Sequence, residues 1–291
     1  MNDILAVALT CQAIGEKAIE PKVWRDLRSV LETLDGEGLT AWAEKRLSPG
    51  DAAQVARRIE LLPEAGEKME TWSQRGISVI TEFDGRYPRK WKETLGDRHP
   101  PVVYVAGNPS LLNADAIAIV GSRDVDDAGT EFTARISEEA VRLGYAVASG
   151  GARGVDQTAM RAAFEAGGAS VGVLADSLLK AASDPELDSG SICLLSPYSP
   201  SAGFSVGNAM GRNKLVYALS EAAVIVASAH GSGGTWAGAV EALEKNLCKV
   251  IVREGTEGSS ALIAKGGHPI KDASTLAKLL NDERSPQGRL L

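Results

Sequence analysis

The feature of this sequence that most restricts its fold is an alternation, from Ala116 onward, of short apolar runs and longer amphipathic segments. The apolar runs predict six strands: Ala116–Val120, Ala146–Ser149, Ser170–Leu174, Ile192–Leu195, Ala222–Ala227 and Lys249–Val252. The segments between them predict four helices: Thr130–Leu143, Asp156–Ala166, Arg212–Leu219 and Thr235–Asn246. Strands that are apolar throughout belong in a parallel sheet with helices on both faces. We therefore predict an α/β fold, a doubly wound, Rossmann-like parallel sheet.

The chain ahead of this alternation predicts two further parts. Apolar positions recur at helical spacing in the first part, and Ser48 or Asp51 is placed to cap one of its helices. Two β-branched runs, Ile77–Thr81 and Val102–Val105, then predict edge strands. The predicted domains are an N-terminal helical module over residues 1–74, a connector with edge strands over 75–114, and a Rossmann-like ligand-binding domain over 115–291.

Charge restricts how this chain meets a polyanion. The net charge is −7, and residues 115–255 contain 11 Lys/Arg against 17 Asp/Glu. Proteins that bind nucleic acid over a broad face are usually basic, so any polyanion contact must be confined to one cleft.

No apolar run approaches the roughly 20 residues that cross a bilayer. The three cysteines are far apart and odd in number. We expect a cytoplasmic protein without a membrane partner.

Two loops at the predicted sheet edge carry arginine among small residues. Strand-to-helix loops of a parallel sheet gather at one edge, where α/β folds bind ligands. The first loop contains Gly121, Ser122 and Arg123, and an arginine there can hold a phosphate with two hydrogen bonds. In the second loop, backbone N–H groups can face an anion. Its candidate ligand-binding residues are Ser149, Gly150, Gly151, Arg153 and Gly154. Asp156 is placed to cap the helix that follows.

Two further loops extend the candidate site. Two cations at a predicted helix start oppose the usual preference for acidic residues, and an anionic ligand explains them. The candidates there are Asn208, Arg212, Asn213 and Lys214. The last loop offers small residues and two hydroxyls ahead of a helix, through Ser232, Gly233, Gly234 and Thr235. The four loops together predict a site for a phosphate-bearing ligand, with no cofactor and no metal.

These motifs resemble those of the DNA-processing A (DprA/Smf) family, within a superfamily that also includes the LOG-type cytokinin-activating enzymes. The resemblance rests on residues 118–123, 149–156, 211–213 and 232–234, and it covers roughly Gly76 to Leu280. It implies a protein that binds single-stranded DNA and helps load the RecA recombinase in natural transformation, with pairing into a homodimer. It also implies that Arg123, Arg153, Arg212 and Lys214 contact phosphates.

The sequence departs from that family in ways that keep a second hypothesis open. An aromatic–proline pair expected ahead of Arg212 is missing, and Phe204 is close but shifted. Asp124, Asp126 and Asp127 follow Arg123 and would repel a DNA backbone. The Gly233–Trp236 loop is closer to the LOG pattern. A non-catalytic sensor of a small nucleotide-derived ligand is therefore the alternative function.

An enzyme is a third hypothesis, because LOG relatives hydrolyse the N-glycosidic bond of nucleoside monophosphates. Their motif has an acidic residue just after the threonine, whereas here the first acid after Thr235 is Glu241. That carboxylate lies almost two helical turns along, too far to act at the scissile bond. His99, His230 and His268 have no metal-ligand spacing. The sequence therefore predicts no catalytic residue.

Overall fold

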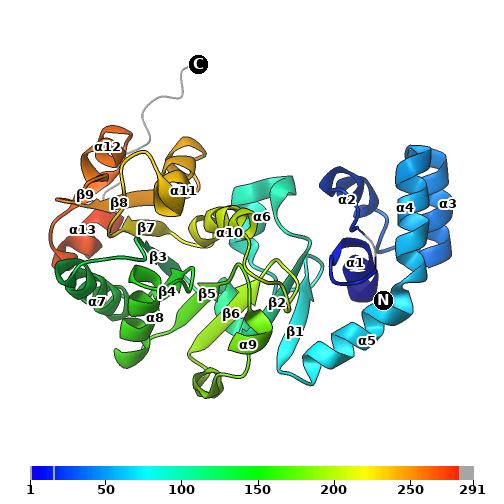
Figure 1. The fold of residues 1–291 in the computed structure, drawn as a ribbon, viewed down its shortest axis with the longest axis horizontal. Coiled ribbons are helices and arrows are strands. Elements are labelled where there is room, and N and C mark those ends of the chain that lie inside the picture. Colours follow the sequence, from blue (N-terminus) through cyan, green and yellow to red (C-terminus); the bar gives the residue numbers. More distant parts are fainter. Residues whose placement is uncertain (1, 16, 282–291) are drawn as a thin grey trace. The chain divides into compact units, whose positions relative to one another are not determined.

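The computed structural model describes residues 2–15 and 17–281. Its chain divides into two compact units, one formed by residues 1–113 and 171–212 and the other by residues 114–170 and 213–291. Figure 1 shows the elements of both units along the chain. No helix within the described residues is long and apolar enough to cross a membrane. The predicted domain boundaries at residues 74 and 114 stay a prediction.

The first unit begins with helices, as the sequence predicts. They are α1 (Asn2–Thr10), α2 (Pro21–Leu27), α3 (Gly36–Arg46), α4 (Pro49–Glu60) and α5 (Leu62–Ser73). Ser48 caps α4 by accepting a hydrogen bond from the Asp51 N–H at 3.2 Å, which confirms the predicted cap. Arg58 of α4 is fully buried and donates to the carbonyl oxygens of Ala8, Cys11 and Ile14. Ala8 lies in the last turn of α1, and Cys11 and Ile14 lie in the segment after it, so one guanidinium fixes α4 against the end of α1.

The strands of the first unit follow the order β1-β2-β6-β5. They are β1 (Ile77–Thr81), β2 (Val102–Gly107), β5 (Ser170–Val173) and β6 (Ile192–Ser196). β1 pairs antiparallel with β2, and β2 pairs antiparallel with β6. β1 and β2 thus join the β6 run at one edge of the sheet, as their predicted role as edge strands requires. A strand buried on both faces has the same composition in either direction, so the pattern alone does not fix the pairing. Short helices complete the unit, among them α6 (Arg89–Leu95) and α9 (Leu178–Ala181).

The second unit contains a parallel sheet in the order β4-β3-β7-β8-β9. Its strands are β3 (Ala116–Val120), β4 (Ala146–Ser149), β7 (Ala222–Ile225), β8 (Lys249–Arg253) and β9 (His268–Ile270). β9 was not predicted from the sequence, because it has only three residues, one of them a proline. The helices are α7 (Asp127–Arg142), α8 (Val155–Glu165), α11 (Gly233–Glu244), α12 (Ser259–Ala264) and α13 (Leu276–Asn281).

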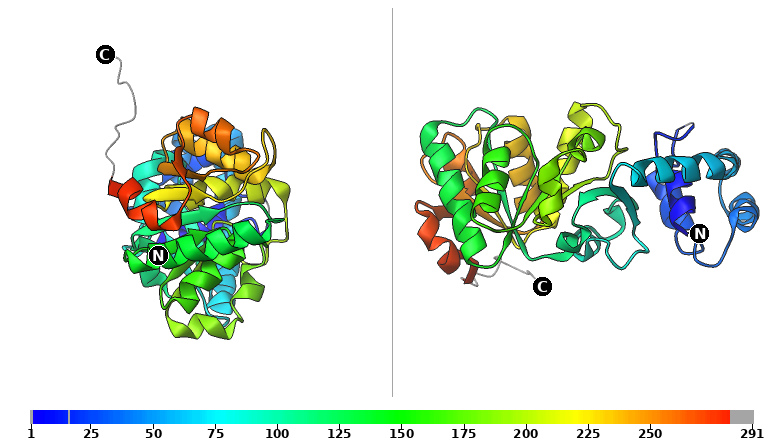
Figure 2. Two further views of the ribbon diagram at one scale, coloured as in Figure 1. Left: turned by 90° about the vertical axis from the view of Figure 1, so that its left-hand side faces the viewer. Right: turned by 90° about the horizontal axis from the view of Figure 1, so that it is seen from below.

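Helices cover both faces of this parallel sheet. Figures 1 and 2 show α7 and α8 on one face and α11 and α12 on the other. Ile117, Val224 and Ile251 of the strands pack with Ile136 of α7 and Ala159 of α8, all fully buried. The predicted α/β, Rossmann-like fold is confirmed. The loops that leave the carboxyl ends of β3, β4 and β7 consequently lie at one edge of this unit.

One helix differs from its predicted start. α10 (Val206–Ala218) begins six residues before Arg212, where the sequence placed the helix start. Asn208, Arg212, Asn213 and Lys214 are therefore helical residues and do not form a loop. Arg212 and Lys214 therefore lie beyond the first turn of α10, where the helix dipole gives no reason to expect an anionic ligand beside them.

Candidate nucleic-acid interface

The loops after β3 and β4 lie in direct backbone contact in the second unit. The Val155 N–H donates to the carbonyl oxygen of Ser122 at 3.3 Å. Gly154 has a φ of +82°, and a Cβ placed on it would lie 2.6 Å from the carbonyl oxygens of Ser122 and Arg123. Only glycine fits both the backbone conformation and this close approach. The glycine run thus brings the backbone after β4 against the backbone of the predicted arginine loop.

The loop after β7 is fixed to the same edge by two side chains. The Thr235 hydroxyl donates to the Gly121 carbonyl oxygen at 3.0 Å, and the Asn213 amide donates to the Gly234 carbonyl oxygen at 3.0 Å. These bonds join the end of β3 to the start of α11, and α11 to α10. The structure therefore brings together three of the four predicted loops, and Thr235 and Asn213 hold them in place.

Several small residues of the candidate site differ in accessibility. Ser149 is fully buried, and its hydroxyl donates to the Ile119 carbonyl oxygen at 2.7 Å. That hydroxyl links β4 to β3 inside the sheet. Gly150 is also buried, whereas Gly151 is half-buried with a φ of +69°. Ser232 and Gly233 are exposed, so their backbone N–H groups at the start of α11 are the more accessible ones.

Arg153 and Asp124 form an exposed ion pair across the two loops. Arg153 Nη2 lies 2.9 Å from Asp124 Oδ1, and their side chains are 73% and 88% exposed. An ion pair this exposed contributes about 0–1 kcal/mol, so a phosphate can replace the carboxylate as the arginine's partner. Arg123 is also exposed. Asp126, which the sequence analysis treated as repulsive to DNA, caps α7 by accepting the Gly129 N–H at 2.7 Å.

Asp156 does not cap α8 in the predicted way. The N-cap residue of α8 is Gly154, and Asp156 lies in the first turn, where it is buried. Its carboxylate accepts a long hydrogen bond of 3.4 Å from the Ala152 N–H. The carboxylate therefore supports the backbone of the glycine loop from inside, near the positive end of the helix dipole.

The first turns of α10 belong to the first unit and contain an aromatic contact that sequence reasoning missed. The Tyr198 hydroxyl donates to the Asn208 carbonyl oxygen at 3.1 Å. Arg212 is only 6% exposed. Burial raises the pKa of Tyr198, and the positive charge of Arg212 partly opposes this effect. Arg212 is therefore shielded from solvent, and a role in folding competes with the predicted phosphate contact.

Two ring contacts lie near these loops. His230 and Trp236 stack edge to face, with ring centroids 5.1 Å apart, beside the loop after β7. The guanidinium of Arg253, at the end of β8, lies 5.2 Å from the ring centroid of Phe132. The position of Arg253 at a strand end could have marked it as a candidate from the sequence, but it was not predicted.

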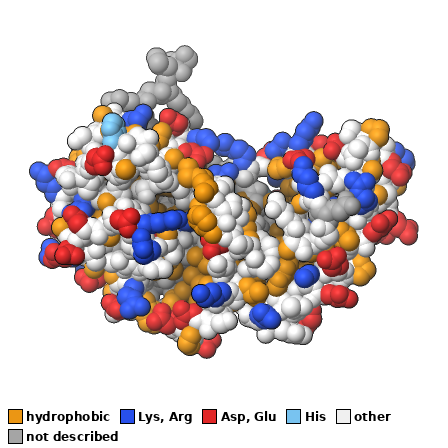
Figure 3. Space-filling model, in the orientation of Figure 1, with side chains coloured by type: hydrophobic (Ala, Val, Ile, Leu, Met, Phe, Trp, Pro, Cys, Tyr) orange, Lys and Arg blue, Asp and Glu red, His pale blue; other side chains and the backbone are white. Residues whose placement is uncertain are grey.

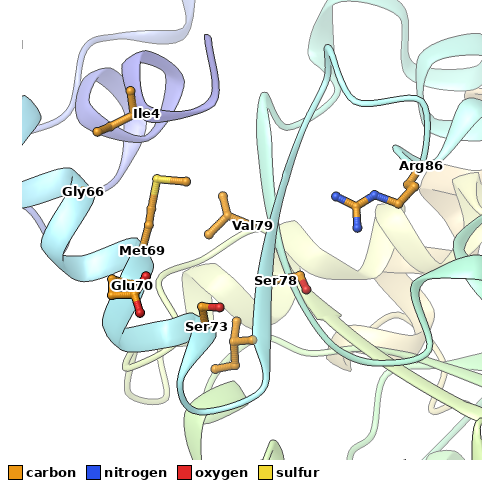
Figure 4. A pocket seen from close by; sticks show the side chains of 9 residues that line it. Ile4, Gly66, Met69, Glu70, Ser73, Ser78, Val79 and Arg86 are labelled. Carbon is orange, nitrogen blue, oxygen red and sulfur yellow. The ribbon is translucent and has the colours of Figure 1, made fainter. Parts of the chain in front are cut away.

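The first unit also contains a cavity of about 410 Å³ between α1, α5 and β1. Figure 4 shows Met69 of α5 and Val79 of β1 pointing toward each other across it. Glu70 and Arg86 also line the cavity, and Arg86 is paired with Asp84 at 2.6 Å. The wall mixes apolar and polar side chains, and its one guanidinium already has a carboxylate partner, so it offers a phosphate no uncompensated cation. None of the predicted site residues lies there. Within the described residues, no group of three His, Cys, Asp or Glu side chains is arranged to hold a metal.

Comparison with known sequences decides the family. The sequence model for DNA recombination-mediator protein A matches residues 78–281, which is most of the chain. The chain belongs to this family. The DNA processing protein DprA of Bacillus subtilis is 27% identical over 189 residues, which cover 62% of this chain and 63% of the relative. A putative DNA processing protein DprA of Mycobacterium tuberculosis is 27% identical over 262 residues, covering 78% and 65%. The chain thus spans less than two thirds of these relatives.

Solved structures of the family share the fold. DNA processing protein A from Streptococcus pneumoniae matches with a TM-score of 0.74 and 19% identity, over 96% of this chain and 98% of that one. DNA processing protein A from Helicobacter pylori, whose single-stranded DNA binding mode has been studied structurally, matches with a TM-score of 0.58 and 22% identity. That match covers 70% of this chain and 95% of the other. At these identities the likeness shows the fold.

Proposed function

We propose that this chain is a DNA-processing protein that binds single-stranded DNA through the loops after β3, β4 and β7. The observation that carries the proposal is the pair of exposed arginines, Arg123 and Arg153, beside a glycine loop whose backbone lies against the arginine loop. Membership of the DNA recombination-mediator family and the described DNA binding of the Helicobacter pylori member support the choice of ligand. Lys214 of α10 is the third candidate cation.

The chemistry suits a small number of phosphates. Guanidinium groups hold phosphate oxygens with two hydrogen bonds, and backbone N–H groups at a helix start favour an anion. The net charge of −7 means that the rest of the surface opposes a polyanion. Binding should therefore depend on a few cations. The logarithm of the association constant should fall linearly with the logarithm of the salt concentration, with a slope of about −0.7 for each phosphate contact on a single strand.

The test is a titration of labelled oligo-dT of about 30 nucleotides over a range of salt concentrations. The variant Arg123→Gln, Arg153→Gln should bind more weakly and with a shallower salt dependence. The matched control is Arg135→Gln, Arg142→Gln, which removes the same charge from exposed positions of α7 in the same unit. Asp124→Asn should bind more tightly, because it releases Arg153 from its carboxylate partner. Arg212 is not used in the test because it is buried.

A sensor of a small nucleotide-derived ligand is the second candidate. The stacked His230 and Trp236 beside Ser232 and Gly233 favour it, because they offer ring faces next to backbone N–H groups within one loop. Absence of oligo-dT binding at low salt, together with stabilisation by a nucleotide in a thermal shift assay, would support it. Hydrolysis is disfavoured because Glu241 lies six residues after Thr235 on α11, almost two helical turns from it.

Two finer expectations belong to the same proposal. The family resemblance implies a RecA-like recombinase as partner and pairing of two copies of the chain. Sedimentation of the purified protein tests the pairing. Filament formation by a recombinase on DNA that is covered by a single-strand-binding protein, with and without this chain, tests the loading.

A further inference from the structure

A second concentration of positive charge lies in the first unit, on α2 and α6 and outside the candidate loops. Residues 86–98 contain five Lys/Arg and two Asp/Glu, and residues 21–28 contain three Lys/Arg and one Asp. The chain as a whole has a net charge of −7, so these two segments oppose its general balance. Figure 3 shows Lys and Arg side chains over α2 and α6.

Direct contacts join the two segments into one surface. Arg28, just after α2, lies 2.5 Å from Asp97, which follows α6. Trp24 of α2 donates to the Glu82 carboxylate at 2.8 Å, and the Lys92 ammonium of α6 donates to the Glu82 carbonyl oxygen at 2.5 Å. Glu82 thus binds both helices, so α2 and α6 lie side by side within the unit.

Five exposed cations make up what we call the α2–α6 basic surface: Lys22, Arg25, Arg89, Lys92 and Arg98. None of the five is ion-paired with a carboxylate among the described residues, whereas their neighbours Arg28 and Arg86 are. Lys22 and Arg25 lie on α2, Arg89 and Lys92 on α6, and Arg98 in the turn after α6. The cations of these segments outnumber the carboxylates Asp26, Glu93 and Asp97, and they repel one another. Their repulsion is relieved when an anion binds.

Neutral groups hold three of these cations in place. Arg89 Nε donates to the Asn113 side-chain oxygen at 3.4 Å, and Arg98 Nε donates to the Leu95 carbonyl oxygen at 3.4 Å. Lys92 donates to a backbone carbonyl, as described above. These acceptors orient the side chains and leave their net positive charge uncompensated. A ligand therefore meets cations that have already lost part of their conformational freedom.

The surface has the composition of a phosphate-backbone contact. Among the described residues the large exposed apolar side chains are Phe204, Val206 and Met210, and none of them belongs to this surface. It therefore lacks the aromatic anchors of a protein interface and the apolar face that inserts into a membrane. We propose that the α2–α6 basic surface is a second nucleic-acid contact, which binds the phosphate backbone without reading sequence. This inference rests on the proposed function for its choice of polymer.

The experiment compares two fourfold variants of the full chain. The test variant is Lys22→Gln, Arg25→Gln, Arg89→Gln, Arg98→Gln. Lys92 is retained because its ammonium also supports Glu82. The control variant is Lys45→Gln, Lys68→Gln, Arg75→Gln, Lys180→Gln, which removes the same charge from exposed positions of the same unit. The probes are oligo-dT of about 60 nucleotides and a duplex of about 30 base pairs, each titrated at several salt concentrations.

On oligo-dT, the slope of log K against log salt concentration should be shallower for the test variant by up to about 3. Each lost phosphate contact removes about 0.7 from this slope. The control variant should keep the wild-type slope. The two probes show whether single strand, duplex or both use the surface. Equal slopes for the test and control variants would overturn the proposal. The proposal would also be overturned if the test variant lost the wild-type protein's binding to phosphatidylglycerol vesicles while its DNA binding stayed unchanged, since the surface would then bind a membrane. Failure of the loop site is a separate result, seen when Arg123→Gln, Arg153→Gln binds like wild type.

Discussion

Thr235 and Gly121 lie 114 residues apart in the sequence, and the Thr235 hydroxyl donates a hydrogen bond of 3.0 Å to the Gly121 carbonyl oxygen. The bond connects the first turn of α11 to the end of β3. It therefore fixes the loop after β7 beside the arginine loop, and the shape of the proposed site depends on a contact within the protein itself.

Replacing Thr235 by valine tests this link. Thr235→Val removes the donor and leaves the Gly121 carbonyl without it, so the free energy of unfolding should fall by about 1–2 kcal/mol. Thr235→Ser keeps the donor and should lose less than half of that. Urea unfolding followed by circular dichroism measures both. Equal losses for the two variants would mean that the methyl group, and not the hydroxyl, carries the effect.

Alanine substitutions at Gly144 and Gly154 distinguish the cost of backbone strain alone from the added cost of a close backbone contact. Gly144 has a φ of +88° with open space around its Cβ position, so Gly144→Ala should destabilise the protein by about 1–2 kcal/mol. Gly154 has a φ of +82°, and an added Cβ would also meet two carbonyl oxygens at 2.6 Å. We expect Gly154→Ala to destabilise by more than about 3 kcal/mol, measured by urea unfolding. If the two substitutions destabilise equally, the contact between the loops after β3 and β4 is looser than described.

Arg58 and Arg57 are neighbours on α4 with opposite surroundings. Arg58 is fully buried and donates to three carbonyl oxygens, whereas Arg57 is exposed. Arg58→Met leaves those carbonyls unsatisfied and should lower the free energy of unfolding by about 3 kcal/mol or more. Arg57→Met should change it by less than about 0.5 kcal/mol. Thermal or urea unfolding of both variants is the measurement, and similar values for the two would contradict the assigned role of Arg58.

His99 should make stability depend on pH. Burial lowers its pKa from 6.5, and this effect exceeds the opposing attraction of Glu82, while Arg28 and Lys92 add to the lowering. Its Nδ1 also lies 3.3 Å from the Tyr87 hydroxyl. The unfolded chain therefore binds a proton more readily than the folded protein. Stability from this group is complete above pH 6.5 and is lost as the pH falls toward the lower folded pKa.

The measurement compares wild type with His99→Gln by urea unfolding at about pH 7.5 and about pH 5.5. Wild type should lose more stability than the variant over this interval, because the variant has no imidazole to protonate. Carboxylates elsewhere titrate equally in both proteins and cancel in the difference. A wild-type protein that loses less stability than the variant would show that the ion pair with Glu82 outweighs burial.

The sequence predicted most strands of the fold because they are apolar throughout or, like β1, rich in β-branched residues. β1, β3 and β4 begin and end at the predicted residues, since each run is bounded by polar or glycine positions. The start of α10 was placed six residues late because Gly207 and Gly211 weaken a helical pattern. β9 gave no signal because a three-residue strand depends on its pairing with β8.

The candidate site was predictable as a set of loops but not in its detail. Small residues at strand ends identified the loops after β3, β4 and β7, which do meet at one edge. Burial of Ser149 and Arg212 was not predictable, because it depends on contacts that are distant in sequence. The pairing of Arg153 with Asp124 likewise joins two loops 29 residues apart.

Phe204 tests whether an aromatic ring contributes to the proposed DNA binding although it is shifted from the position expected by resemblance. Its side chain is 62% exposed, so Phe204→Ala should leave the free energy of unfolding within about 0.5 kcal/mol of wild type. If a base stacks on the ring, the same substitution should weaken oligo-dT binding by about 1–3 kcal/mol, and Phe204→Tyr should retain it. Val206→Ala is the matched control, since Val206 is 68% exposed and has no ring face. Unchanged affinity in Phe204→Ala would mean that arginines and backbone N–H groups carry the binding without the ring. The affinity should then follow the salt concentration as expected for phosphate contacts alone.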